Sequence, residues 1–189
     1  ALASCERVRR RFLVHGTIAG VRIVEDYGHH PAEIRATIAA ARLAGGRVHV
    51  VFQPHRFTRT YDCFADFVAA FDQAHRVVLL PVYGAGEIPI EGATSDALIT
   101  AMRQCREQLP TASAEVAALS DRGEAVAFVC DEAVAGDTVL ILGAGDVGEC
   151  AVLVRDFFCR RRQGPASDVA SPDFSVHSHE PVELTCVSA

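Results

Sequence analysis

Short apolar runs typical of buried β-strands alternate with longer segments of helical periodicity, and this alternation constrains the fold of the chain more than any other feature. It predicts strands at residues 12–18, 21–25, 48–52, 77–82, 115–119 and 138–142. It predicts helices from 31 to the glycines at 45–46, and at 62–74, 95–109, 121–134 and 147–162. Such βα repetition with short connections predicts an α/β domain, a mostly parallel open sheet of Rossmann-like type with helices on both faces.

The chain is long enough for one domain with a sizeable core, because half of its 189 residues are hydrophobic. Residues 12–162 carry the alternation, so residues 1–11 are interpreted as the end of a preceding domain or a linker. Residues 163–189, rich in Gly, Pro, Ser and Asp, are interpreted as a disordered tail. His177 and His179 in that tail form a pair that could bind a metal, but a solvated tail is the preferred interpretation and no metal site is expected.

The first predicted helix is expected to bury an apolar face made of Ile34, Ile38, Ala41 and Leu43. The second is expected to bury a face made of Phe64, Phe67, Val68 and Phe71.

Composition argues against several classes of function. A net charge of -6 and a pI near 5.7 disfavour a nucleic-acid binder. No apolar run approaches the roughly 20 residues that span a bilayer, so we expect no membrane association and a cytoplasmic location. The seven cysteines are scattered without a CxxC pair, which favours reduced thiols over zinc or disulfides.

The chain contains no lysine, so it cannot carry a Walker phosphate-binding loop. It begins at Ala1, and its only methionine is Met102, which suggests a piece of a longer protein. If that protein uses ATP, we expect its phosphate loop to lie elsewhere.

Two polar segments follow predicted strands directly, at the sheet edge where ligands bind in open α/β folds. The first, at residues 26–31, places the carboxylate of Asp26, the phenol of Tyr27 and the imidazoles of His29 and His30 in one turn. These groups suit contacts to ribose, orientation of an amine or proton transfer. The alternative is that a histidine caps the next helix and Asp26 satisfies loop amides.

The second segment, at residues 53–60, places His55, Arg56 and Arg59 within five residues. Two guanidiniums at this spacing can converge on one small anion, and each matches a carboxylate in bidentate fashion. The position at a strand end favours an anion site over a solvated charge cluster. The run Arg9-Arg10-Arg11 just before the first strand is a further possible contact.

The sequence Gly143-Ala144-Gly145-Asp146-Val147-Gly148 fits the GxGxxG pattern of a dinucleotide fingerprint between a strand and a helix. The acidic residue expected about 20 residues later is missing, because arginines occupy residues 160–162. A tight turn that lets the last helix pack closely is therefore preferred over an NAD(P)-binding oxidoreductase.

Taken in order, DYGHHP, FQPHRFTRT, VYGAGEIPI and GAGDVG resemble the C-terminal domain of the Mur ligase family, over about Val8 to Arg162. Within the family, the intact QPHRxTR segment resembles the branch that adds L-alanine to UDP-N-acetylmuramate, whereas the murein-peptide recycling branch keeps HHP but lacks QPHRxTR. The resemblance implies a three-domain enzyme of peptidoglycan precursor synthesis. Its upstream domains would bind the UDP-sugar, ATP and Mg²⁺, and the reaction would pass through an acyl phosphate.

The same resemblance implies roles for individual residues. Arg56 and Arg59 would hold the carboxylate of L-alanine, with His55 and Tyr27 completing the pocket. His29 would lie near the reacting centre, where it is the nearest candidate base by residue type.

Asp26 and Arg11 would reach the nucleotide. Without the ATP loop, this chain is expected to be inactive alone. A noncatalytic small-anion-binding module stays open as an alternative, and the amino acid could be alanine, glycine or serine.

Overall fold

The structure is a computed structural model that describes residues 11–107 and 115–163. The described strands are β1 (Leu13–Ile18), β2 (Val21–Asp26), β3 (Val48–Phe52), β4 (Arg76–Leu79), β5 (Glu115–Ala118) and β6 (Thr138–Leu142). The α-helices are α1 (Pro31–Arg42), α2 (Phe57–Asp62), α3 (Phe64–Ala70), α4 (Ser95–Glu107), α5 (Arg122–Cys130) and α6 (Cys150–Gln163), with a 3₁₀ turn η1 at Asp146–Glu149. The predicted alternation of strands and helices is confirmed.

The six strands form one sheet in the order β1-β2-β6-β3-β4-β5. Only the β1–β2 hairpin is antiparallel, with its turn at Ala19-Gly20, and all other described neighbours are parallel. The expected mostly parallel sheet is therefore confirmed. The last strand, β6, lies between β2 and β3 and pairs with both.

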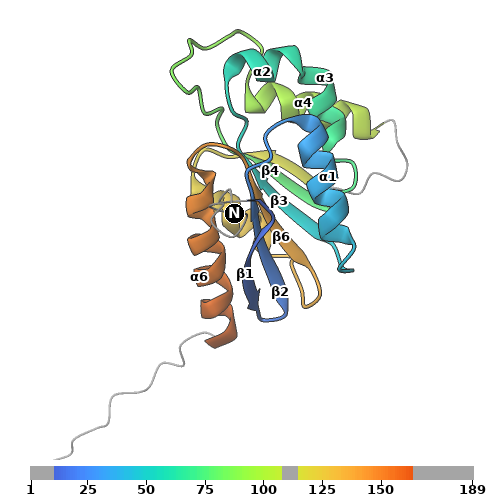
Figure 1. The fold of residues 1–189 in the computed structure, drawn as a ribbon, viewed down its shortest axis with the longest axis vertical. Coiled ribbons are helices and arrows are strands. Elements are labelled where there is room, and N and C mark those ends of the chain that lie inside the picture. Colours follow the sequence, from blue (N-terminus) through green and yellow to red (C-terminus); the bar gives the residue numbers. More distant parts are fainter. Residues whose placement is uncertain (1–10, 108–114, 164–189) are drawn as a thin grey trace, which may run out of the picture.

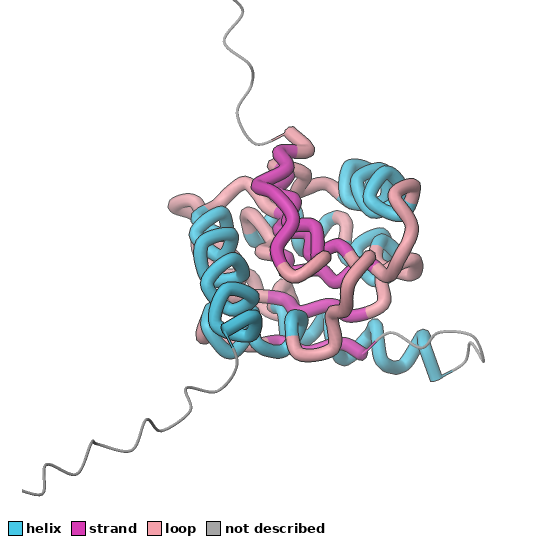
Figure 2. The backbone as a smooth tube through the Cα atoms, turned by 90° about the horizontal axis from the view of Figure 1, so that it is seen from below, coloured by secondary structure: helices cyan, strands magenta, loops and turns pink. Residues whose placement is uncertain are grey.

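Helices cover both faces of the sheet, as Figures 1 and 2 show. On one face, α1, α3 and α4 bury residues such as Ile38, Phe67 and Met102 against alternate strand residues. On the other face, α5 and α6 bury Val126, Val129 and their neighbours. Each core strand is buried on both sides because helices lie above and below it.

Helix α1 begins with a capping box at the end of the β2–α1 connection. The Nδ1 atom of His30 accepts a hydrogen bond from the amide of Ala32, and the carboxylate of Glu33 accepts from the amides of His29 and His30. Pro31 occupies the first turn, where its missing N–H costs nothing. The alternative that a histidine caps this helix is confirmed for His30.

Several predicted boundaries are wrong. The helix expected at 62–74 is the shorter α3, and a further short helix, α2, precedes it where loop was expected; the two meet at Cys63. Leu43 lies just beyond α1 and is 89% exposed, so it belongs to no buried face. Strand β4 ends at Leu79, α5 ends at Cys130, and the last helix begins as a 3₁₀ turn.

A charged cluster lies at the amino edge of the sheet, opposite the carboxyl ends of the parallel strands. The Asp137 carboxylate accepts hydrogen bonds from the amides of Arg47 and Val134, the Arg47 guanidinium and Nε2 of the buried His49. Burial alone would raise the pKa of Asp137, but these bonds outweigh it and hold the pKa at about 2. Burial lowers the pKa of His49.

Within residues 11–107 and 115–163, no helix is both long and apolar enough to cross a bilayer. Of the predicted tail at 163–189, Gln163 is the last residue of α6, and the rest, with His177 and His179, lies outside the described residues, as do Arg9 and Arg10.

Candidate functional site

The two polar segments predicted from the sequence meet at the carboxyl edge of the sheet, at the top of Figure 1. The ends of β2 and β3 flank the end of β6, so His29 and His55, which are 26 positions apart in the sequence, become neighbours. Four rings form a continuous row there: the centroids of Tyr27 and His29 are 5.3 Å apart, those of His29 and His55 5.7 Å, and those of His55 and Tyr83 5.4 Å. Tyr83 was not among the predicted site residues.

His29 is held by a hydrogen bond that fixes which ring nitrogen carries the proton. Its Nδ1 atom lies 3.0 Å from the backbone carbonyl oxygen of Tyr27. Because a carbonyl only accepts, Nδ1 must donate, and in the neutral ring Nε2 is left as the acceptor. The half-buried imidazole therefore offers one defined nitrogen to take up a proton.

Asp26 is engaged by its own loop. One carboxylate oxygen accepts from the amide of Phe12 at 2.7 Å, and the other accepts from the amide of Gly28 at 2.7 Å and the hydroxyl of Thr37 at 3.4 Å. These contacts fix the start of β1 against the end of β2 and bring the exposed Arg11 next to the Asp26 loop. The expected loop-amide role is confirmed, while a contact from Asp26 or Arg11 to a nucleotide stays a prediction.

Arg56 and Arg59 lie at the first turn of α2, a helix that the sequence prediction had treated as loop. Arg56 is the N-cap, with φ 73° and ψ 134°, a rarely populated conformation for a non-glycine residue. Its amide donates to the carbonyl of Tyr83 at 2.8 Å, and its carbonyl accepts from the amide and hydroxyl of Thr60. Such an outlier, held on both sides by hydrogen bonds, is typical of binding sites.

The side chains of this turn surround His55. Nη1 of Arg59 donates to the carbonyl of His55 at 3.1 Å and lies 3.5 Å from His55 Nδ1. Burial, together with the nearby His29, Arg59 and Arg56, lowers the pKa of His55. His55 is therefore neutral at neutral pH, and the positive charge of this turn comes from the two guanidiniums.

The loop after β4 supplies two side chains that sequence reasoning missed. Tyr83 stacks on His55 with an interplanar angle of 15°, and residues 55 and 83 form a parallel bridge. Glu87 accepts from the amide and hydroxyl of Thr58 at 3.0 and 2.8 Å, which caps α2. The VYGAGEIPI motif was the available signal, but nothing in its spacing indicates contact with residues 29 positions earlier.

The GxGxxG segment forms a tight turn, the interpretation that the sequence favoured over a dinucleotide-binding loop. A Cβ atom on Gly145 would lie 2.4 Å from Gln53 Oε1 and 3.0 Å from Tyr83 Cγ. Gln53 Nε2 donates to Asp146 at 2.8 Å, and Asp146 also pairs with Arg122. Protein groups thus occupy the start of η1, and in the described part of the chain no strand follows α6. The close approach that needs glycine is to the end of β3 and to Tyr83.

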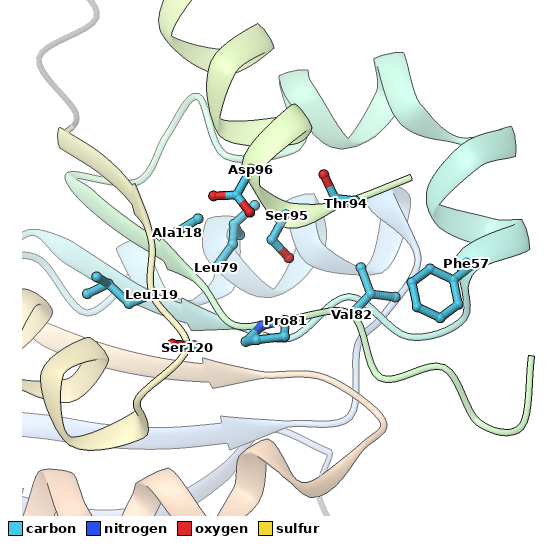
Figure 3. A pocket seen from close by; sticks show the side chains of 10 residues that line it. All are labelled: Phe57, Leu79, Pro81, Val82, Thr94, Ser95, Asp96, Ala118, Leu119 and Ser120. Carbon is cyan, nitrogen blue, oxygen red and sulfur yellow. The ribbon is translucent and has the colours of Figure 1, made fainter. Parts of the chain in front are cut away.

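A separate hollow of about 400 Å³ lies at the carboxyl ends of β4 and β5, beside the start of α4 (Figure 3). Figure 3 shows Phe57 and Val82 side by side at one end of it. None of the predicted site residues lines this hollow, and its walls contain no cation. An anion is therefore better matched by the arginine turn.

The described residues contain no group of three or more His, Cys, Asp or Glu side chains placed to hold a metal ion. The sequence also lacks lysine, and Arg11 and Asp26 are the residues predicted to reach a nucleotide.

The fold and the edge together define the class: a mostly parallel α/β domain that gathers two guanidiniums and two imidazoles at the carboxyl edge of its sheet. Residues 10–145 match the family described as Mur ligase, glutamate ligase domain. The chain belongs to this family.

Curated relatives support membership of this family. The chain is 44% identical over 154 residues to the UDP-N-acetylmuramate–L-alanine ligase of Acidobacterium capsulatum, covering 81% of the chain and 32% of that protein. It is 47% identical over 148 residues to the ligase of the same name from Anaeromyxobacter sp., covering 78% of the chain and 31% of that protein. The chain spans about a third of the length of these relatives.

Solved structures share the fold. A crystal structure of the UDP-N-acetylmuramate-alanine ligase MurC from Thermotoga maritima matches with a TM-score of 0.59 at 20% identity, over 79% of this chain and 30% of that one. The murein peptide ligase of Psychrobacter arcticus matches with a TM-score of 0.59 at 17% identity, over 79% of this chain and 30% of that one. Both confirm the α/β architecture.

Proposed function

We propose that this chain is the C-terminal domain of an ATP-dependent ligase that joins L-alanine to UDP-N-acetylmuramate in peptidoglycan precursor synthesis. The observation that carries the proposal is the QPHRxTR segment, whose Arg56 and Arg59 lie in the first turn of α2 at the carboxyl edge of the sheet. The names of the curated relatives support the same reaction.

In this proposal Arg56 and Arg59 bind the carboxylate of L-alanine. Arg56 is 52% exposed at its side chain, so its donors are available to a ligand. The planar fork of Arg suits a carboxylate in bidentate geometry. His55 and Tyr27 line the same row of rings and complete the pocket. Holding the amino acid by its carboxylate fixes the direction of its amine.

His29 is the proposed base. The alanine amine must lose a proton when it attacks an activated carboxyl group, and the defined acceptor Nε2 of His29 suits that task. When bound, ATP with Mg²⁺ supplies the activation of the carboxyl group of UDP-N-acetylmuramate. Arg11 and Asp26 are the residues of this chain proposed to reach the nucleotide, and the rest of its site belongs to upstream domains. The proposed location is the cytoplasm.

The other interpretations have less support. The murein-peptide recycling ligase shares the fold, but the relatives at 44–47% identity carry the alanine-ligase name. The oxidoreductase interpretation loses its basis because Gln53 and Tyr83 crowd the GxGxxG turn. A noncatalytic anion-binding module keeps the same arginines, so only activity separates it from the ligase.

The test is an assay of the longer protein that carries this chain together with its upstream domains. We expect ADP release that requires both UDP-N-acetylmuramate and L-alanine, and we expect Arg56→Gln and Arg59→Gln each to raise the KM for alanine at least tenfold. Arg42→Gln, which changes an exposed arginine at the end of α1, serves as the matched control. An active parent whose two site variants match this control would refute the site, and a parent inert with every amino acid would refute the ligase.

A further inference from the structure

Glu87 makes a set of contacts that the proposed mechanism does not use. Its two carboxylate oxygens accept from the amide and hydroxyl of Thr58, and Oε1 lies 3.7 Å from Nη1 of Arg56. The hydrogen bond from the Thr58 amide is the main cause that lowers the pKa of Glu87. A permanent negative charge is therefore held beside one of the two proposed site arginines, and it comes from a loop on the next strand.

The Arg56–Glu87 contact is an ion pair of longer range rather than a hydrogen bond. At 3.7 Å it partly neutralises the guanidinium without occupying its N–H donors, which stay available to a ligand. The stronger bonds of Glu87 go to Thr58 and fix the carboxylate in place. Glu87 therefore acts on the charge of the site while leaving its binding surface open.

The charges of this turn can be added because His55 is neutral there. Arg56 and Arg59 contribute two positive charges and Glu87 contributes one negative charge, which leaves a net charge of about +1. A site with one excess positive charge matches one carboxylate. Without Glu87 it would carry two and would favour a dianion.

We propose that Glu87 is a specificity-determining residue that sets the charge of the Arg56–Arg59 site to that of a single carboxylate. The inference rests on the proposed function, in which these arginines bind the carboxylate of the amino acid. It implies a substrate class: amino acids with one carboxylate are accepted, and acidic amino acids and other dianions are disfavoured because the second negative charge is repelled by Glu87.

Two variants separate the effect of the Glu87 charge from the effect of Glu87 as the cap of α2. Glu87→Gln removes the charge but keeps an oxygen that can accept from Thr58, whereas Glu87→Ala removes both. Glu91→Gln removes the same charge from an exposed position in the same loop and is the matched control. Butyrate and succinate are suitable probes because they share a four-carbon chain and differ in charge by one at neutral pH.

The measurement is the dissociation constant of each probe for the 189-residue chain at fixed low ionic strength, followed by NMR chemical shifts of backbone amides. Removing one nearby charge should strengthen butyrate binding roughly threefold and succinate binding roughly tenfold in Glu87→Gln, because the Coulomb energy scales with ligand charge. Added salt should shrink both gains. In Glu87→Ala the absolute affinities also reflect the lost cap, but the preference for succinate over butyrate should still rise roughly threefold.

An unchanged preference in both Glu87 variants, or an equal rise in Glu91→Gln, would overturn the inference. Failure of the proposed site is recognised separately with Arg56→Gln and Arg59→Gln. If these variants bind butyrate as well as the unmodified chain does, the anion site lies elsewhere and the role of Glu87 fails with it. If they lose binding while the Glu87 variants keep the original preference, the arginine site stands and only the role of Glu87 is wrong.

Discussion

Replacing Asp137 with Asn should cost the domain about 2 kcal/mol of unfolding free energy at neutral pH. The buried carboxylate accepts from two amides, one guanidinium and one imidazole, and its pKa is held at about 2 against an ordinary 3.8. That difference between folded and unfolded states corresponds to about 2 kcal/mol. Asn keeps the shape but turns an amide N–H₂ toward groups that are themselves donors, so this figure is a lower bound.

The loss should depend on pH in a defined direction. Because the folded-state pKa of Asp137 is depressed, its contribution is complete above about pH 4 and is lost as the pH falls from 3.8 through about 2. At pH 3 about 1 kcal/mol should remain. The neighbouring His49 is held neutral by burial, so its own effect is a loss of stability as the pH falls through 6.5. A His49→Gln background in both proteins removes that second titration, and the Gln amide can still donate to Asp137 in place of the imidazole.

Urea unfolding of the His49→Gln chain with and without Asp137→Asn, at pH 7 and pH 3, measures the effect. We expect a difference in unfolding free energy of at least about 2 kcal/mol at pH 7 that is smaller by about 1 kcal/mol at pH 3. A difference that is equal at the two pH values would show that the loss does not come from the ionised carboxylate. No difference at pH 7 would refute the hydrogen-bonding argument itself.

Three further results are expected. Ile38→Ala removes a fully buried side chain from the α1 face and should cost about 2–5 kcal/mol in urea unfolding, and a cost below 1 kcal/mol would contradict the core assignment. Gly145→Ala should destabilise the domain by about 1–3 kcal/mol, because its Cβ would meet Gln53 Oε1 at 2.4 Å, and a neutral effect would show that this turn can relax. Burial raises the pKa of the Cys130 thiol to about 12, so at pH 8 iodoacetamide should alkylate the exposed Cys159 and spare Cys130 until the protein unfolds, which peptide mass spectrometry would check. Equal labelling of the two thiols in the folded protein would contradict the burial.

The sequence allowed the layers and strands to be predicted because period and burial are local properties. The run at 48–52 is uniformly apolar apart from His49, and β3 is buried on both faces. Helix α2 was missed because the second motif was treated as loop. In the structure the carbonyl of Arg56 accepts from the hydroxyl of Thr60, one helical turn later. The early end of β4 has a visible cause in Pro81, which lacks the N–H that a central strand needs.

The candidate site was predictable only as two separate segments. Placing Asp26 and Arg56 at strand ends was enough to expect both at one edge of the sheet. The row of rings that includes Tyr83 and the cap from Glu87 depend on the strand order and on a loop conformation, which no local pattern encodes. Contacts across 28 or more residues are a property of the tertiary fold.

The position of β6 between β2 and β3 has a consequence for how the domain is made. The two strands that end at the proposed site, β2 and β3, do not pair with each other. Each pairs with β6, the last of the described strands in the chain. During synthesis, β2 and β3 leave the ribosome long before residue 138. The strand position between them in the sheet stays unfilled until β6 follows. A nascent or prematurely terminated chain that stops before β6 therefore cannot close the sheet or bring the DYGHHP and QPHR loops together. Ligand binding at the proposed site would therefore require that translation has passed β6.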